Sequence, residues 1–391
     1  MPRLICFILM LFLITRATAQ GSNRSAESQA TLTGEFHPTI ATYCIVERLV
    51  AANQGWLFYM DGKESYDYIP LVAKAFKRYG TLDNSSIIQS MKDYLAVVGN
   101  TQDLTYQVLV RMGKFPDTTL KYPLDDVMVP AEHLVAFRTF LKALYRFYIE
   151  RDLAAFFQEN SQAINGGVNE FLSNVPEGYL GKMEAYFGQR FLRYVVYTMP
   201  FDAVPMDRQN EKDFFHGNAQ TIHTPAGKMV TMVTSAFRPV DSASEKNHYG
   251  FDHPDYVKLI ITHEFGHAFV NHLVDSMPKE VKVTEAIFLN SGMKEKMEQS
   301  AYTTWQVTLR EYLVRVGEIR IAETNGENQR AADLRKKYIT DMYFVLIPKL
   351  EKKFIEYEKN RSKYPEFENF MPEIFALLRQ VRPEEVKALL N

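Results

Sequence analysis

The hydrophobic pattern of the chain changes its period twice, and this change restricts the possible folds more than any other feature. Between residues 41 and 190 apolar side chains recur every three or four positions, which is the spacing of amphipathic helices. Two β-branched and aromatic runs follow at 194–197 and 229–234, and their composition is typical of strands. Helical spacing returns at Tyr256 and continues to the last residues. Helices, a small sheet and further helices predict a mostly helical α+β protein.

The first nineteen residues have the layout of a secretory signal peptide. Arg3 precedes an apolar run over 4–14, and Ala17-Thr18-Ala19 follows as a small-residue cleavage site. The run is shorter than the roughly 20 residues that span a bilayer, and no later run is long enough, so we expect no transmembrane segment. Removal of residues 1–19 would leave Cys44 as the one cysteine, without an internal disulfide. The sequence therefore predicts a secreted or periplasmic protein.

The rest of the chain divides by composition and by period. Residues 20–40 are rich in Ser, Thr, Gly and Asn and are expected to form a flexible leader. We expect a mainly helical region over 41–190, a core with the sheet and the site over 191–330, and a helical C-terminal region over 331–391. With 45 basic and 47 acidic side chains, the chain has no cationic excess to bind nucleic acid. Nothing in the pattern fixes an oligomeric state.

Seven of the nine histidines lie between positions 216 and 272, and two of them belong to an H-E-x-x-H pattern. Residues four apart share one face of a helix, so His263 and His267 can bind one metal ion. Glu264, beside His263, can reach a metal-bound water without being a ligand itself. The neighbouring positions are uncharged and lack proline, which favours a buried metal site. The alternative is a helix with two surface histidines and a glutamate in a salt bridge.

A catalytic zinc ion usually has three protein ligands, so one more is required. His272 is a poor candidate because it lies about 140° round the helix from His267 at about 100° per residue. The apolar stripe over 302–322 predicts a packed helix. On it Glu311 is the favoured ligand, with Arg315 one turn later to orient its carboxylate. Glu318 is the reserve ligand and is otherwise expected to pair with Arg315 or to remain solvated.

The same three charges on that helix have a second interpretation. Glu311, Arg315 and Glu318 fall at intervals of four and three residues. Such a spacing also occurs in a solvated ladder of alternating charges, which contributes only small helix-stabilising ion pairs.

Two short strings resemble a known family. The residues 262–271 and the string Glu311-Tyr312-Leu313-Val314-Arg315 are similar to those of secreted bacterial proteins catalogued as a domain of unknown function. Members of that family are regarded as gluzincin-type zinc metallopeptidases. The resemblance implies a gluzincin-like core in which His263, His267 and Glu311 bind Zn²⁺ and Glu264 is the general base. The interval of 44 residues between His267 and Glu311 is longer than in thermolysin-like enzymes.

These features predict a secreted zinc metallopeptidase that acts on a peptide or protein substrate. Zinc would activate a water, and Glu264 would accept its proton and pass it to the leaving amine. One alternative is a catalytically inactive zinc-containing binding or scaffold protein, although the intact Glu264 favours turnover. The other is an amidase that acts on cell-wall peptide.

Two further expectations concern the substrate. The residues 228–235 are the candidate edge strand for pairing with an extended peptide, and an ordinary buried strand is the alternative. An oxyanion formed from the carbonyl also needs a hydrogen-bond donor near the zinc. The sequence offers several candidates without choosing among them, namely Tyr302, Tyr312, His216 and His223.

Overall fold

The computed structural model describes residues 30–390 apart from several short internal segments. The segments left out are 55–58, 61–62, 65–68, 100–101, 125–126, 128, 204–216, 239, 241–243 and 301. The predicted signal peptide and residues 20–29 of the predicted leader lie outside the described residues. Among the helices that are described, none is both long and apolar enough to cross a membrane.

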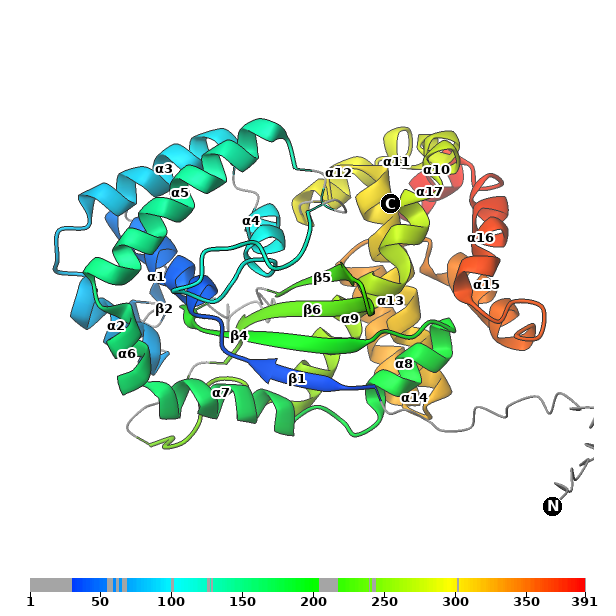
Figure 1. Cartoon of the computed structure of the whole chain (residues 1–391). Coiled ribbons are helices and arrows are strands. Elements are labelled where there is room, and N and C mark those ends of the chain that lie inside the picture. The colour runs from blue at the N-terminus through cyan, green and yellow to red at the C-terminus, as the bar shows by residue number, and fades with distance from the viewer. Residues whose placement is uncertain are drawn as a thin grey trace, which may run out of the picture.

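A four-stranded sheet lies at the centre of the molecule in the order β1-β4-β6-β5 (Figure 1). The strands are β1 (Leu32–Glu35), β4 (Arg193–Ala203), β5 (Gly217–Thr224) and β6 (Gly227–Ala236). β4 pairs in parallel with both β1 and β6, whereas β5 pairs antiparallel with β6 through a tight hairpin. A separate two-stranded sheet joins β2 (Tyr59–Met60) and β3 (Lys63–Glu64).

The sheet is buried on both faces, so it forms the middle of three layers. Along β4 the side chains alternate between two hydrophobic cores, with Tyr194 and Val196 in one and Val195 and Tyr197 in the other. A strand covered on both faces is apolar at successive positions rather than at alternate ones. This explains the continuous apolar run that identified β4 in the sequence.

Helices from the N-terminal part cover one face of the sheet (Figure 1). α1 is buried along most of its length and packs directly on β4. The helices of this layer are α1 (Pro38–Asn53), α2 (Pro70–Tyr79), α3 (Ser85–Val98), α4 (Gln102–Leu109), α5 (Ala131–Glu150) and α6 (Leu153–Glu159). Pro stands in the first turn of α1 and α2, where its missing N–H costs no helical hydrogen bond.

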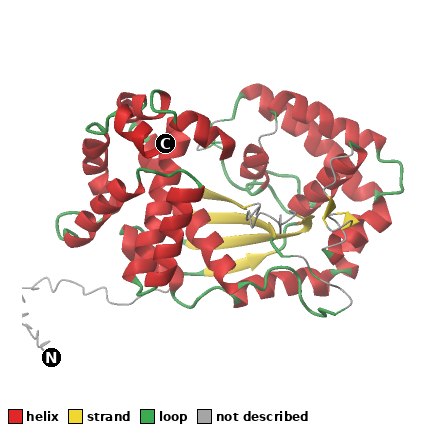
Figure 2. Ribbon diagram, turned by 180° about the vertical axis from the view of Figure 1, so that it is seen from behind, coloured by secondary structure: helices red, strands yellow, loops and turns green. Residues whose placement is uncertain are grey.

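The opposite face is covered by the remaining helices, and Figure 2 shows the strands between the two groups. α7 (Ser161–Ser173) lies along the β1 edge, and α9 (Pro254–Asp275) packs on β5 and β6. α8 (Tyr179–Phe187) and α13 (Trp305–Thr324) pack on α9. Around them lie α10 (Pro278–Thr284), α11 (Ala286–Leu289), α12 (Met293–Met297), α14 (Asn328–Lys336), α15 (Ile347–Lys359), α16 (Met371–Leu378) and α17 (Pro383–Leu390).

The α+β prediction is confirmed, and both predicted strands lie within β4 and β6. The leader prediction is wrong for its last residues, because β1 begins at Leu32 and α1 at Pro38. β1 needs few large side chains, since its main chain pairs with β4 and Gly34 packs against α7. A Cβ at Gly34 would lie 2.7 Å from a methyl carbon of Val168.

The predicted edge strand over residues 228–235 is also wrong. These residues lie in β6, which pairs with β4 on one side and with β5 on the other. The hairpin turn returns the chain so that β5 forms the edge instead. β5 carries only one fully buried side chain, Ile222. Its sequence therefore lacks the apolar signal that identified β6.

Candidate metal centre

The helix α9 carries the H-E-x-x-H residues through the interior of the protein. It begins after His253, whose Nδ1 accepts the main-chain N–H of Tyr256, and Pro254 stands in its first turn. Val257, Ile260, Phe265 and other apolar residues bury it on most sides. A helix held on several sides fixes the ligands that it carries.

α9 and α13 approach each other closely at Gly266, between the two histidines of the pattern. A Cβ on Gly266 would lie 3.2 Å from a methyl carbon of Val314 on α13, which is tighter than an ordinary contact. Glycine at this position therefore lets α13 pack against the histidine face of α9. This packing brings Glu311 to the two histidines.

The candidate ligand atoms of His263, His267 and Glu311 lie close together. The two Nε2 atoms are 3.4 Å apart, His267 Nε2 is 3.4 Å from Glu311 Oε1 and His263 Nε2 is 3.7 Å from Glu311 Oε2. Bonds of about 2.0–2.1 Å at tetrahedral angles separate zinc ligands by about 3.3–3.4 Å. Each of these separations is near that value, and one ligand atom from each of the three side chains lies within 4.8 Å of the other two.

The other ring nitrogens are held by oxygen acceptors. His263 Nδ1 donates to Glu318 Oε1 at 2.6 Å, and His267 Nδ1 donates to Asn271 Oδ1 at 3.0 Å. A carboxylate and an amide oxygen only accept hydrogen bonds, so each Nδ1 carries the proton. Both Nε2 atoms, without a proton in this tautomer, are left to face Glu311. Metal-binding histidines are held in this way by a second hydrogen bond.

The electrostatics of the pocket favour a positive charge between these groups. Burial lowers the pKa of His263, but the hydrogen bond and charge of Glu318 raise it, and the resulting pKa lies above the ordinary value. Burial lowers the pKa of His267 to about 4. Burial raises the pKa of Glu311, yet the charges of His267, His263 and Arg315 bring it below its ordinary value. A metal ion competes with the proton for such a site, which offers neutral imidazole and carboxylate.

Glu311 is also held by two neighbours other than the histidines. Arg315 Nη2 donates to Glu311 Oε2 at 3.1 Å and to the Tyr302 hydroxyl oxygen at 2.9 Å. A hydrogen bond from Tyr302 also lowers the pKa of Glu311. Burial raises the pKa of Tyr302 to about 12, so this phenol stays protonated. The solvated charge ladder is wrong, since Glu311, Arg315 and Glu318 are all buried.

The surroundings of the Glu318 side chain differ from those that the sequence predicts. It was expected to pair with Arg315 or to be solvated if Glu311 were the ligand, but its side chain is fully buried. One carboxylate oxygen accepts a hydrogen bond from His263 Nδ1, and the other accepts one from the Tyr338 hydroxyl. Glu311 and Glu318 both reach His263 from α13. The seven-residue interval between them could not show that the second would lie behind the histidine ring.

The remaining candidate site residues from the sequence differ in their burial and in the elements that carry them. Glu264 is buried, with 6% of its surface exposed, next to His263 on α9. Tyr312 is buried and its oxygen accepts the N–H of Leu346. His223 is exposed on β5 and His272 is half-buried in the last turn of α9. His216 lies outside the described residues.

Asn271 and Tyr338 were missed in the sequence. The spacing of Asn271, four residues after His267 on the same helix, is a signal that helix geometry alone could have used. Tyr338 follows Glu318 by twenty residues in a different element. No local spacing connects the two, so only the tertiary structure identifies this contact.

A second group of metal-binding side chains lies away from α9, but its charges are already compensated. The group consists of Glu170, His248 and Asp252. Asp252 accepts two hydrogen bonds of 2.7 Å from the guanidinium of Arg238. Glu170 accepts main-chain N–H groups of Tyr249 and Phe251. We therefore interpret this group as a structural ion network.

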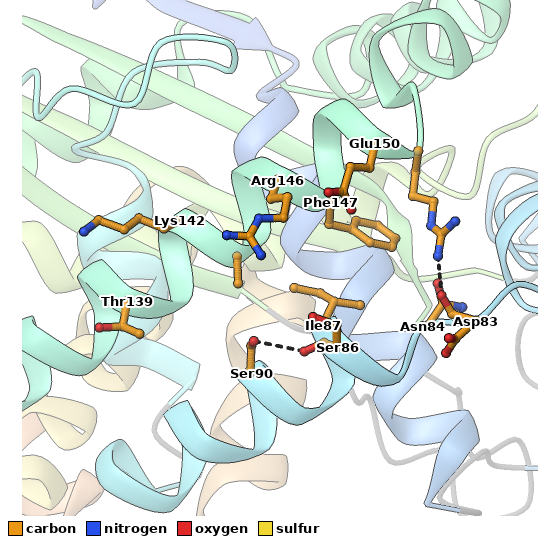
Figure 3. A pocket seen from close by; sticks show the side chains of 12 residues that line it. Asp83, Asn84, Ser86, Ile87, Ser90, Thr139, Lys142, Arg146, Phe147 and Glu150 are labelled. Carbon is orange, nitrogen blue, oxygen red and sulfur yellow. Dashed lines mark hydrogen bonds between the residues drawn. The ribbon is translucent and has the colours of Figure 1, made fainter.

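A surface hollow of about 300 Å³ lies between α3 and α5, on the other side of the sheet (Figure 3). Lys142 and Arg146 of α5 and Ser86 and Ser90 of α3 contribute to its lining. The Ser90 hydroxyl donates to the main-chain oxygen of Ser86, one turn earlier. The hollow is separate from the cluster on α9 and α13.

The fold and this cluster define an α+β protein with a candidate metal centre between two buried helices. The chain belongs to the family described as a domain of unknown function, DUF4932, whose model matches residues 96–377. That range contains α9, α13 and the strands β4, β5 and β6. No curated protein and no solved structure shows a significant match to the chain.

Proposed function

We propose that this protein is a zinc-dependent hydrolase of peptide bonds with a gluzincin-like site. His263, His267 and Glu311 would hold the ion, and Glu264 would be the general base. The observation that supports this most strongly is the grouping of both Nε2 atoms, 3.4 Å apart, with the Glu311 carboxylate. Its Oε1 lies 3.4 Å from His267 Nε2 and its Oε2 lies 3.7 Å from His263 Nε2. The oxygen partners on both Nδ1 atoms support it as well, because they direct both Nε2 atoms to the same point.

Bound zinc would supply a Lewis acid that makes water more acidic and a carbonyl more electrophilic. The chain supplies the remaining functions. Glu264 accepts a proton from the attacking water and delivers it to the leaving amine. Arg315 and Tyr302 hold the carboxylate of Glu311, and Tyr302 is thereby engaged with this ligand rather than with an oxyanion. The low exposure of the site excludes water from the charged groups, which strengthens their interactions.

The edge strand β5 is the proposed substrate platform. It packs against α9, runs antiparallel to β6 and ends the sheet on this side. An edge strand can pair with an extended peptide through main-chain hydrogen bonds. Most residues of β5 are half-exposed, so a peptide can approach. The main-chain carbonyl of Thr221 already accepts a hydrogen bond from the guanidinium of Arg111. A bound peptide would therefore pair with β5 only as far as this residue.

The test is a cleavage assay in which a mixed peptide library is incubated with the protein from residue 20 onwards, without the predicted signal peptide. We expect cleavage by the zinc-loaded protein, loss of cleavage after dialysis against a chelator, and recovery when zinc is returned. Cleavage of cell-wall peptides alone would support the amidase alternative. A protein that binds zinc and cleaves neither kind of substrate would support a binding or scaffold role and contradict the proposal.

A further inference from the structure

We propose that the segment 338–344 is a positioning element that fixes two metal ligands from two different helices. This inference rests on the proposed metal site and extends it to residues far from the H-E-x-x-H pattern. Tyr338 and Phe344 are the residues that act, and both are buried. They would act through Glu318 and Arg315 rather than by binding the ion.

The first series of contacts links Tyr338 to His263 through hydrogen bonds. The Tyr338 hydroxyl donates to Glu318 Oε2, and Glu318 Oε1 accepts His263 Nδ1 at 2.6 Å. Each carboxylate oxygen is therefore used by one partner. Because Tyr338 fixes the rotation of the Glu318 carboxylate, it also fixes the plane of the His263 ring and the direction of Nε2.

The second series of contacts links the same segment to Glu311 through Arg315. The guanidinium carbon of Arg315 lies 4.7 Å from the ring centre of Tyr338 and 4.8 Å from that of Phe344. A cation held on two aromatic rings without water is strongly favoured. The guanidinium in turn donates to Glu311 Oε2 at 3.1 Å. Tyr338 therefore supports His263 of α9 through its hydroxyl and Glu311 of α13 through its ring.

The backbone of the segment has an unusual course that places both rings at Arg315. Residues Lys337–Asp341 form a π-helical turn, and Tyr343 has a φ of 60°. π-helical turns are rare and occur often at functional sites, and a positive φ is unfavourable for a bulky residue. The N–H of Phe344 donates back to the Tyr338 carbonyl at 2.9 Å. This reversal brings the rings of both residues to the Arg315 guanidinium.

The experiment compares Tyr338→Phe with a matched control, Tyr357→Phe. The first variant removes the hydroxyl, which contacts both Glu318 and Arg315, but keeps the ring beneath Arg315. The control removes another buried tyrosine hydroxyl, which donates to the Tyr186 carbonyl at 3.0 Å in the same C-terminal region. Zinc affinity is measured by competition with a chromophoric chelator. The visible spectrum of the cobalt-substituted protein reports the ligand geometry independently of catalysis.

We expect Tyr338→Phe to bind zinc about 3- to 10-fold more weakly, a smaller loss than the roughly 10- to 100-fold that is typical when a direct partner of a metal ligand is removed. Its cobalt spectrum should differ from that of the wild type, whereas Tyr357→Phe should match the wild type in both measurements. Thermal melting of each metal-free variant separates an effect on folding from one on metal binding. A third variant, Tyr338→Leu, also removes the ring beneath Arg315 and should lose more affinity than Tyr338→Phe.

Two outcomes would overturn the inference. If the wild type binds zinc and Tyr338→Phe has the same affinity and the same cobalt spectrum, the segment does not position the ligands. If the wild type takes up no zinc or cobalt, the proposed metal site itself fails, and this inference fails with it. The wild-type titration therefore distinguishes failure of the positioning role from failure of the proposed function.

Discussion

Replacing Glu264 with glutamine should abolish peptide cleavage while zinc remains bound at one ion per chain. Glutamine has nearly the same shape as glutamate but cannot accept the proton of the attacking water. Loss of a general base typically lowers the rate by about 10²- to 10⁴-fold. The change leaves His263, His267 and Glu311 in place, so the zinc content should not fall. The measurement combines the library assay with elemental analysis of the same preparation.

The control for this variant is Glu280→Gln. Glu280 lies on α10 and pairs with Arg379 at the surface, so the same chemical change there should leave cleavage intact. Unchanged hydrolysis by Glu264→Gln would exclude Glu264 as the base. Loss of zinc from that variant, with a normal melting temperature, would show that Glu264 binds or supports the ion.

Replacing Glu311 with glutamine should weaken zinc binding more than any other single change in α13. We expect a loss of more than about 100-fold, because removal of a partner one step further from the metal already costs about 10- to 100-fold. Glutamine is preferable to alanine, since Arg315 would otherwise be left buried without its partner, which destabilises a protein by about 3–5 kcal/mol. Zinc titration of the purified variant, with its melting temperature as a check on folding, measures the effect.

Glu318→Gln is the comparison for Glu311→Gln. Glu318 accepts the N–H of His263 Nδ1, so this substitution removes the partner of one proposed ligand rather than a ligand itself. An intermediate loss of about 10- to 100-fold is therefore expected. Zinc affinity should fall in the order wild type, Glu318→Gln, Glu311→Gln, and the reverse order for the two variants would contradict Glu311 as the ligand.

Local helix geometry was enough to predict part of this site. His263 and His267 lie on one face because residues four apart always do in an α-helix. The Glu311–Arg315 contact has the same origin, since it also joins residues four apart on one helix. The apolar runs within β4 and β6 were recognisable because both strands are buried on two faces.

The rest depends on distances between elements, which a single sequence does not encode locally. Glu311 and Glu318 were both candidates until the packing of Gly266 against Val314 set α13 beside α9. Tyr338 reaches Glu318 only because a π-helical turn follows α14. β1 and β5 have little apolar character because the sheet holds them mainly through main-chain pairing.

The central claim, that His263, His267 and Glu311 bind one zinc ion, is tested most directly by crystallography at the zinc absorption edge. Anomalous difference maps from data above and below the edge locate zinc without reference to activity. We expect one peak per chain, within about 2.0–2.2 Å of His263 Nε2, His267 Nε2 and a Glu311 oxygen. A zinc-supplemented crystal without a peak there, or with zinc only at Glu170, His248 and Asp252, would contradict the claim.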